Sequence, residues 1–131
     1  MIEVNIKPTV DVAGSSTAQW WISIFRNDNN QTGDSTESSM NYSDLAKFGL
    51  AAEGANTNWF SYSYDNAGTA GSPTETDLGA SYPISETTFT RVGLHYKYVS
   101  ASTKYVCKAF INGTQVATFD ITTGTGAPYI Q

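Results

Sequence analysis

The sequence predicts an all-β protein folded as an antiparallel two-sheet β-sandwich, and three observations support this class. Ser and Thr occupy 14 and 17 of the 131 positions, whereas charged residues make up only 15%. Aromatic residues reach 13%, and aromatic and β-branched residues favour strands over helices. Apolar residues recur at every second position in several segments, as expected for strands. A closed barrel is the alternative arrangement of the same strands.

Two strands are expected before the first long loop. Residues 2–7 alternate apolar and polar side chains until Pro8 ends the run, which predicts a strand with one buried face. Residues 18–26 are largely apolar on both faces, so we place this strand in the centre of a sheet. Residues 27–44 lack periodicity and are predicted to form a long polar loop.

The middle of the chain is predicted to contain two further strands and a second loop. Residues 45–53 favour a strand with a bulge at Gly49 over one helical turn. Residues 58–64 alternate Phe and Tyr with Trp and Ser, which indicates a strand. Residues 65–76 are rich in Gly, Ser, Thr and Pro, which predicts a loop.

The strongest local pattern lies near the C-terminal end of the chain. Residues 88–98 and 104–111 are predicted to be long strands. The pair Asn112-Gly113 follows the second of them, and both residues of a type I′ turn need a positive φ angle, which Asn and Gly tolerate. The sequence therefore predicts a tight hairpin over residues 104–121.

Residues 89–121 resemble the concanavalin A-like and laminin-G jelly-roll superfamily. In that family a strand ends in an aromatic residue, an aliphatic residue, Asn and Gly, a place that Phe110–Gly113 holds here. The runs IEVNIKPTV and QWWISIFR are similar to the opening strands of the family. The resemblance implies a concanavalin A-like jelly roll, with residues 1–131 forming one domain.

Within that superfamily, the chain is similar to domains of bacteriophage virion proteins, such as capsid decoration proteins and tail-fibre modules. The features that carry this likeness are one Cys, low charge and loops rich in Ser, Thr and Gly. Residues 127–131 are predicted to open a final strand that the sequence does not complete. We therefore expect either a fragment of a longer protein or a sheet edge that a neighbouring chain completes.

Charge and hydropathy argue against several classes of partner. The net charge of −5 argues against a nucleic-acid binder, which needs a basic face. No apolar run approaches the 18 residues of a membrane span. The N-terminus lacks the basic and apolar regions of a secretory signal, so we expect synthesis in a host cytoplasm and a final location in the virion.

The candidate catalytic residues do not form a recognisable constellation. Glu75 and Asp77 are the nearest match to the paired carboxylates of glucanases that share the jelly roll, but a solvated turn is the simpler interpretation. His95 is the single His and is expected on a strand surface. Cys107 is expected to be a small core residue, and the two together are too few for a zinc site. The sequence therefore predicts a protein that is not an enzyme.

Residues 28–34 present oxygen-bearing side chains at alternate positions, as the beginning of a calcium loop does. The candidate ligands are Asp28, Asn30, Thr32 and Asp34. A polar loop with Asx turns is the alternative, and we favour it. No cofactor is therefore expected, with calcium as the one candidate.

Aromatic side chains are the candidate contact residues. Rings exposed on one sheet face could stack on a sugar or bind a protein, since Tyr and Trp are enriched in interfaces, although a sandwich also needs large residues in its core. The candidates are Trp20, Trp59, Tyr62, Tyr64, Tyr96 and Tyr98. We therefore expect a structural domain of a phage virion surface that contacts other virion proteins or itself as a homo-oligomer. The alternative is a carbohydrate-binding module, assisted by calcium.

Overall fold

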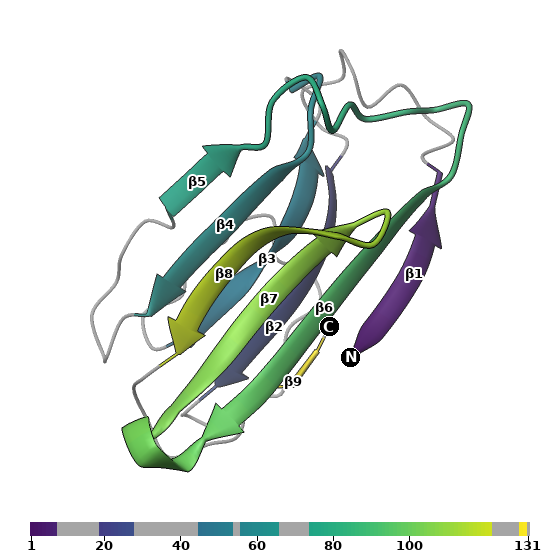
Figure 1. Cartoon of the computed structure of the whole chain (residues 1–131). Helices are drawn as coiled ribbons and strands as arrows, with labels where there is room; N and C mark the ends of the chain where they lie inside the picture. Colours follow the sequence, from purple (N-terminus) through teal and green to yellow (C-terminus); the bar gives the residue numbers. More distant parts are fainter. Residues whose placement is uncertain (8–18, 28–44, 54–55, 66–73, 122–128, 131) are drawn as a thin grey trace.

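The computed structural model of the protein describes residues 1–7, 19–27, 45–53, 56–65, 74–121 and 129–130. These residues form two antiparallel β-sheets that lie face to face (Figure 1). The strands are β1 (Ile2–Ile6), β2 (Gln19–Asn27), β3 (Leu45–Glu53), β4 (Phe60–Asp65), β5 (Thr74–Asp77), β6 (Thr90–Val99), β7 (Lys104–Ile111), β8 (Thr114–Ile121) and β9 (Tyr129–Ile130), with one short 3₁₀ turn, η1 (Ser100–Ser102).

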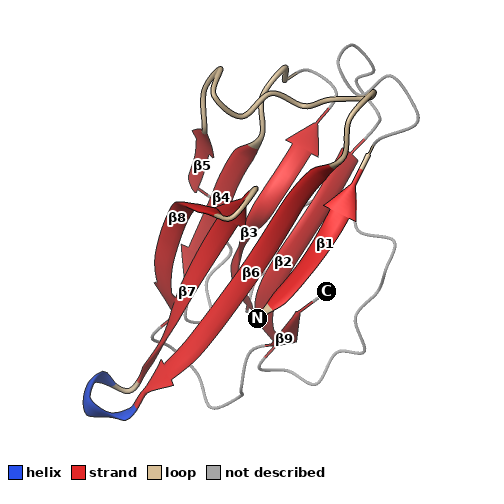
Figure 2. Cartoon of the chain, turned by 45° about the vertical axis from the view of Figure 1, so that its right-hand side comes forward, coloured by secondary structure: helices blue, strands red, loops and turns tan. Residues whose placement is uncertain are grey.

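The four-stranded sheet has the order β1-β6-β7-β8. Its middle is built from neighbours in the sequence, because β6, β7 and β8 follow one another through η1 and a tight turn. Its edge β1 comes from the other end of the chain and pairs with β6 from Ile2 opposite Leu94 to Ile6 opposite Thr90. Figure 2 shows β1 at the margin of this sheet, with no described strand on its far side.

The five-stranded sheet has the order β5-β4-β3-β2-β9. The apolar strand β2 lies inside this sheet between β3 and β9, which confirms its predicted central place. The short strand β9 confirms that the chain opens a strand near residue 129. In the described part of the chain, β5 and β9 are the edges of this sheet.

The core lies between the two sheets. The four-stranded sheet contributes Val92 and Leu94, and the five-stranded sheet contributes Ile24, Phe48 and Leu50, all nearly free of solvent contact. The rings of Phe48 and Phe119 stack across the two sheets with their centroids 6.1 Å apart. Burying these side chains supplies the main free energy that holds the layers together.

The turn between β7 and β8 has the conformation that its sequence predicts. Asn112 and Gly113 have φ angles of 50° and 85°, both positive as a type I′ turn requires. The turn is tied to the start of β6, since Asn112 Oδ1 accepts a hydrogen bond from the Arg91 backbone N–H at 3.0 Å. The Asn112 backbone N–H in turn donates to the Arg91 carbonyl at 2.7 Å. The predicted hairpin over residues 104–121 is therefore confirmed.

The predicted bulge at Gly49 is wrong. The pairing of β3 with β2 and β4 continues through Gly49 without a register shift. Residues on both sides of it, from Ala46 through Phe48 to Leu50, are buried in one core, and a one-residue shift would turn half of them outward. The register shift in the described strands lies between Ala109 and Phe110.

The predicted loop over residues 65–76 is wrong at its end, because Thr74–Asp77 forms the edge strand β5. All four residues of β5 are exposed, so the strand buries no side chain and carries no apolar alternation that could reveal it. Its backbone pairs with β4, for example Glu75 opposite Tyr62.

The five-stranded sheet also carries a buried apolar cluster on its outer face. Phe60 pairs with Ala51, and these two residues form with Tyr62 a second buried cluster separate from the core between the sheets. Ser61, on the other side of β4, faces the core residue Leu50, and Trp59, directly before β4, is buried in the core between the sheets. The aromatic side of β4 is therefore the side that faces away from the core.

Candidate functional site

The candidate carboxylates lie on the exposed edge strand β5. Glu75 and Asp77 are both exposed, and Asp77 has local structural contacts. Its Oδ1 accepts a hydrogen bond from the Gly79 N–H at 2.7 Å, and its Oδ2 accepts one from Asn58 Nδ2 at 3.4 Å. These bonds hold the turn after β5, which fits the interpretation of Asp77 as a turn residue.

His95 and Cys107 lie on opposite faces of the four-stranded sheet. Cys107 pairs with Tyr96 and is fully buried toward the core, whereas the half-buried His95 is opposite Lys108 on the outer face. Burial, assisted by the negative charge of Asp120, raises the pKa of the Cys107 thiol to about 12. A buried thiol of this kind is a poor nucleophile, and the sheet separates it from the single imidazole.

The described residues also bear on metal binding and on membrane insertion. Among them, no group of three or more His, Cys, Asp or Glu side chains is placed to hold a metal ion. The calcium candidates Asp28, Asn30, Thr32 and Asp34 lie outside the described residues. Within the described chain, no helix has the length and apolar character needed to cross a membrane.

Two of the predicted aromatic contact residues are corrected by the structure, because they are buried. Trp59 is 1% exposed and Tyr62 is 0% exposed, so neither ring offers a face to a sugar or a partner. They lie on opposite sides of β4, Trp59 in the core between the sheets and Tyr62 in the second cluster. Trp20 is on β2 and Tyr64 on β4, and their side chains are outside the described structure.

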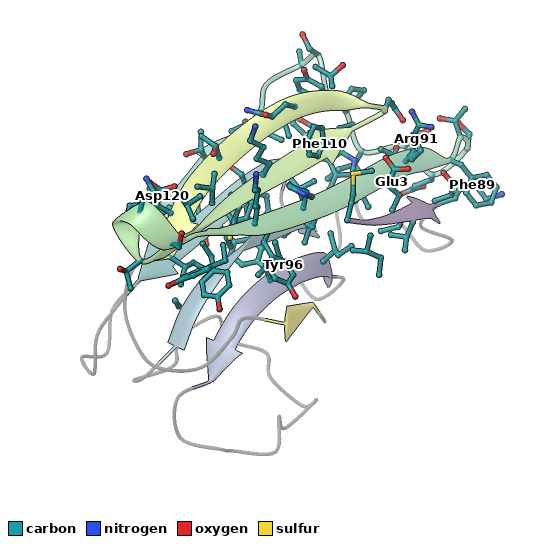
Figure 3. The ribbon with its side chains drawn as sticks, turned by 60° about the horizontal axis from the view of Figure 1, so that its bottom comes forward. Glu3, Phe89, Arg91, Tyr96, Phe110 and Asp120 are labelled. Carbon is teal, nitrogen blue, oxygen red and sulfur yellow. The ribbon has the colours of Figure 1, made fainter. Side chains whose placement is uncertain are left out.

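The other two candidates, Tyr96 and Tyr98, are brought together with Tyr105. The ring centroids of Tyr98 and Tyr105 are 5.0 Å apart, and those of Tyr96 and Tyr105 are 6.1 Å apart with an edge-to-face orientation. Figure 3 shows Tyr96 on the side of the four-stranded sheet that faces the other sheet. Tyr98, at the end of β6, is 48% exposed, so this tyrosine cluster reaches the surface at one of its rings.

The outer edge of β1, with which no described strand pairs, is a second candidate site, and large exposed apolar side chains gather there. Met1 and Ile2, at the start of the strand, are 75% and 38% exposed, and Phe89 is 65% exposed. Phe89 precedes β6 and lies at the far end of β1, where the Lys7 ammonium is 5.2 Å from the centre of its ring. Figure 3 shows Phe89 at this end of the sheet. With Tyr98, these are the large exposed hydrophobic residues of the described chain.

The outer face of the four-stranded sheet is polar and mostly basic. Figure 3 shows Glu3, Arg91 and Phe110 on this face, opposite Tyr96. The register adds Lys97 and Lys108 from β6 and β7 to the same face. Lys104 forms an ion pair with Asp120, but no described acidic group pairs with Arg91, Lys97 or Lys108.

The β1 edge is a site that the sequence does not predict, although part of its pattern is present in the sequence. Phe89 belongs to the strand predicted over residues 88–98, and that prediction does not say to which face of the sheet its side chain points. It is in phase with the outward Arg91 and His95 and out of phase with the inward Val92 and Leu94, so alternation alone predicts an outward Phe. That β1 becomes an edge depends on its pairing with a strand about 90 residues away, which no local pattern reveals.

No protein-family model matches the chain, and neither does any curated protein or solved structure. Function is therefore inferred from the residues and the geometry of this chain alone.

Proposed function

We propose that the protein is a non-enzymatic structural domain that acts through protein–protein contacts, as a capsid decoration, cement or tail-fibre module on a phage virion surface. The fold that we propose for this role is a concanavalin A-like jelly roll. The chain crosses between the sheets after β1, after β5 and after β8, and repeated crossings of this kind are compatible with a jelly roll.

The observation that carries the proposal is the open edge of β1 with its exposed apolar ends. An edge strand presents backbone N–H and C=O groups that can pair with another chain, and exposed apolar side chains beside it favour burial against a partner. Proteins that avoid such contacts protect their edges with charges or Pro. β1 carries Glu3 and Lys7 and is followed by Pro8, but the apolar Met1, Ile2 and Phe89 are still exposed at this edge.

The experiment that tests this role is mass spectrometry of phage particles released by the host whose genome carries this reading frame. We expect the protein in purified particles at a fixed ratio to the major capsid or tail protein. Its absence from the particles, with the protein present in the lysed cells, would overturn the virion role. Neighbouring genes for portal, terminase or capsid proteins would support it.

The tyrosine cluster favours a second candidate function, a carbohydrate-binding module. Tyr98 exposes nearly half of its surface beside Tyr105, and an aromatic ring at the surface can stack on the apolar face of a sugar. A glycan array, run with and without EDTA, tests this candidate. Binding that Tyr98→Ala abolishes would support it, and no binding to any glycan would remove it.

A further inference from the structure

We propose that the free edge of β1 binds a second copy of this chain, by antiparallel β1–β1 pairing around a two-fold axis that passes beside Asn5. This inference rests on the proposed role in protein–protein contacts and names the partner. The four-stranded sheets of the two copies would then form one continuous sheet across the axis. A two-fold contact of this kind uses the same surface on both copies.

The charges of β1 complement one another in this register. In this register Asn5 of one copy faces Asn5 of the other, so Glu3 of each copy faces Lys7 of the other. Because of the two-fold symmetry, this ion pair forms twice in the dimer. Glu3 is exposed and Lys7 half-buried, and opposite charges at facing positions stabilise strand pairs. Within the described part of the chain, neither side chain forms a salt bridge, and the Lys7 ammonium contacts the ring of Phe89.

The apolar residues match in the same register. Val4 faces Ile6 of the second copy, and Ile6 faces Val4. Both residues are half-buried and pack against the core between the sheets. The apolar inner face of one four-stranded sheet therefore continues into that of the other.

Antiparallel pairing also brings the exposed apolar ends of β1 together. Met1 and Ile2 are at the start of the strand, and Phe89 lies beside Lys7 at its end. The start of one β1 meets the end of the other, so Phe89 of each copy lies near Met1 of its partner on the outer face, whereas Ile2 lies on the inner face with Val4 and Ile6. Burial of these groups removes apolar surface from water, which adds stability that five-residue strands alone would lack.

Neighbouring registers lack this match. An axis beside Val4 places Glu3 opposite Asn5 and Lys7 opposite Met1, which leaves both charges without a partner. An axis between two residues places apolar side chains opposite polar ones and turns the buried face of one copy toward solvent. The axis beside Asn5 is therefore the one that satisfies both the charges and the apolar face.

Charge reversal at the two facing positions tests the pairing in the full chain. Sedimentation equilibrium should find a dimer for the wild type, and Glu3→Lys or Lys7→Glu should weaken it by roughly tenfold, because like charges then face each other twice. The double variant Glu3→Lys/Lys7→Glu should restore most of the affinity. Lys97→Glu makes the same charge change at an exposed site on β6 and should leave the dimer unchanged.

A cysteine at the axis tests the register. Facing residues of an antiparallel pair have Cα atoms roughly 4.5–5.5 Å apart, within the range that a disulfide spans. Asn5→Cys should therefore give a covalent dimer under mild oxidation, whereas Glu3→Cys should not. The native Cys107 is fully buried and does not compete. Urea unfolding of each variant confirms that the sandwich itself is intact.

The outcomes separate this inference from the proposed function. A monomer at every concentration, with no cross-linking of Asn5→Cys, would overturn self-pairing. A dimer whose affinity is unchanged by both Glu3→Lys and Lys7→Glu would also overturn it. The virion role depends instead on the presence of the protein in particles. A monomer found in particles would contradict the self-pairing alone, and a dimer absent from them would contradict the virion role alone.

Discussion

The outer faces of the two sheets differ in chemistry, although both sheets contribute equally clear inner faces to the core. The four-stranded sheet exposes charged residues such as Glu3, Arg91 and Lys97 on its outer side. The five-stranded sheet carries Phe60 and Tyr62 on its outer side, and both are buried there. The outer face of the four-stranded sheet is therefore polar, whereas that of the five-stranded sheet holds a buried apolar cluster beside the exposed Glu75 and Asp77 of its edge strand.

This difference shows what alternation can and cannot indicate. In β6 the polar and apolar residues divide between the two faces, so the buried side is evident from the sequence. In β4 the polar Ser61 and Ser63 face the core, opposite Leu50 and Phe48, while the outer face carries Phe60 and Tyr62. Hydropathy alternation would therefore assign the wrong face of β4 to the core between the sheets.

The largest expected effect comes from placing a charge on each face of β6. Leu94→Asp puts a carboxylate into the core with no partner, and we expect a loss of at least about 4 kcal/mol and of cooperative unfolding. His95→Asp, at the next position on the outer face and opposite Lys108, should change stability by less than about 1 kcal/mol. Urea unfolding followed by circular dichroism measures both. Equal losses would contradict the one-sided burial of this sheet.

A matched pair of Phe substitutions compares the two outer faces directly. Phe60→Ala empties a buried site and should cost about 3–5 kcal/mol. Phe110→Ala, on the outer face of β7 where the ring is half-buried, should cost only about 1 kcal/mol. The measurement is the free energy of unfolding in urea. A small loss for Phe60→Ala would mean that the second cluster does not contribute as a core does.

The thiol on the inner face of β7 gives a pH-dependent test. Burial raises the pKa of Cys107 to about 12, above its ordinary value of 9.0, so the folded state keeps this proton when the unfolded state loses it. The contribution of the protonated Cys107 thiol to the free energy of unfolding is fully present below pH 9. It falls by about 1.4 kcal/mol per pH unit as the pH rises toward 12.

Comparison with Cys107→Ala isolates this effect from the titration of Tyr and Lys. Wild-type stability should fall more steeply than that of the variant between pH 9 and 11, as thermal unfolding at several pH values measures. Parallel pH profiles would indicate that the thiol is accessible to water.

The smallest expected effect comes from glycines with positive φ angles. Gly113, in the β7–β8 turn, and Gly79, after β5, have φ angles of 85° and 78°. Substitution by Ala should cost about 1 kcal/mol at each site, because a side chain disfavours this conformation. An added Cβ at Gly113 would lie 3.0 Å from Arg91 Nη2, whereas nothing lies within 4 Å at Gly79.

The exposed Arg91 side chain can move away, so we expect the two losses to be similar in chemical denaturation. A loss several times larger for Gly113→Ala would indicate that Arg91 is held against the turn.

The hairpin over residues 104–121 and the edge strand β1 illustrate how much of the fold the sequence predicts. Asn112-Gly113 determines the turn locally, and the alternation of residues 2–7 determines a strand, so both elements were predictable. The partner of β1, the position of β5 and the continuous pairing through Gly49 depend on contacts between distant segments. The candidate site was less predictable, because exposure of Phe89 and burial of Trp59 follow from how the sheets are assembled.

The pairing of β1 with β6 has a consequence for the order of events during synthesis. Ile2 and Leu94 are 92 positions apart, so β1 is synthesised well before its partner strand β6. Contacts this distant close a long loop and form slowly. The proposed edge for self-pairing thus takes shape only after β6 has been synthesised, which would delay pairing between nascent chains on neighbouring ribosomes.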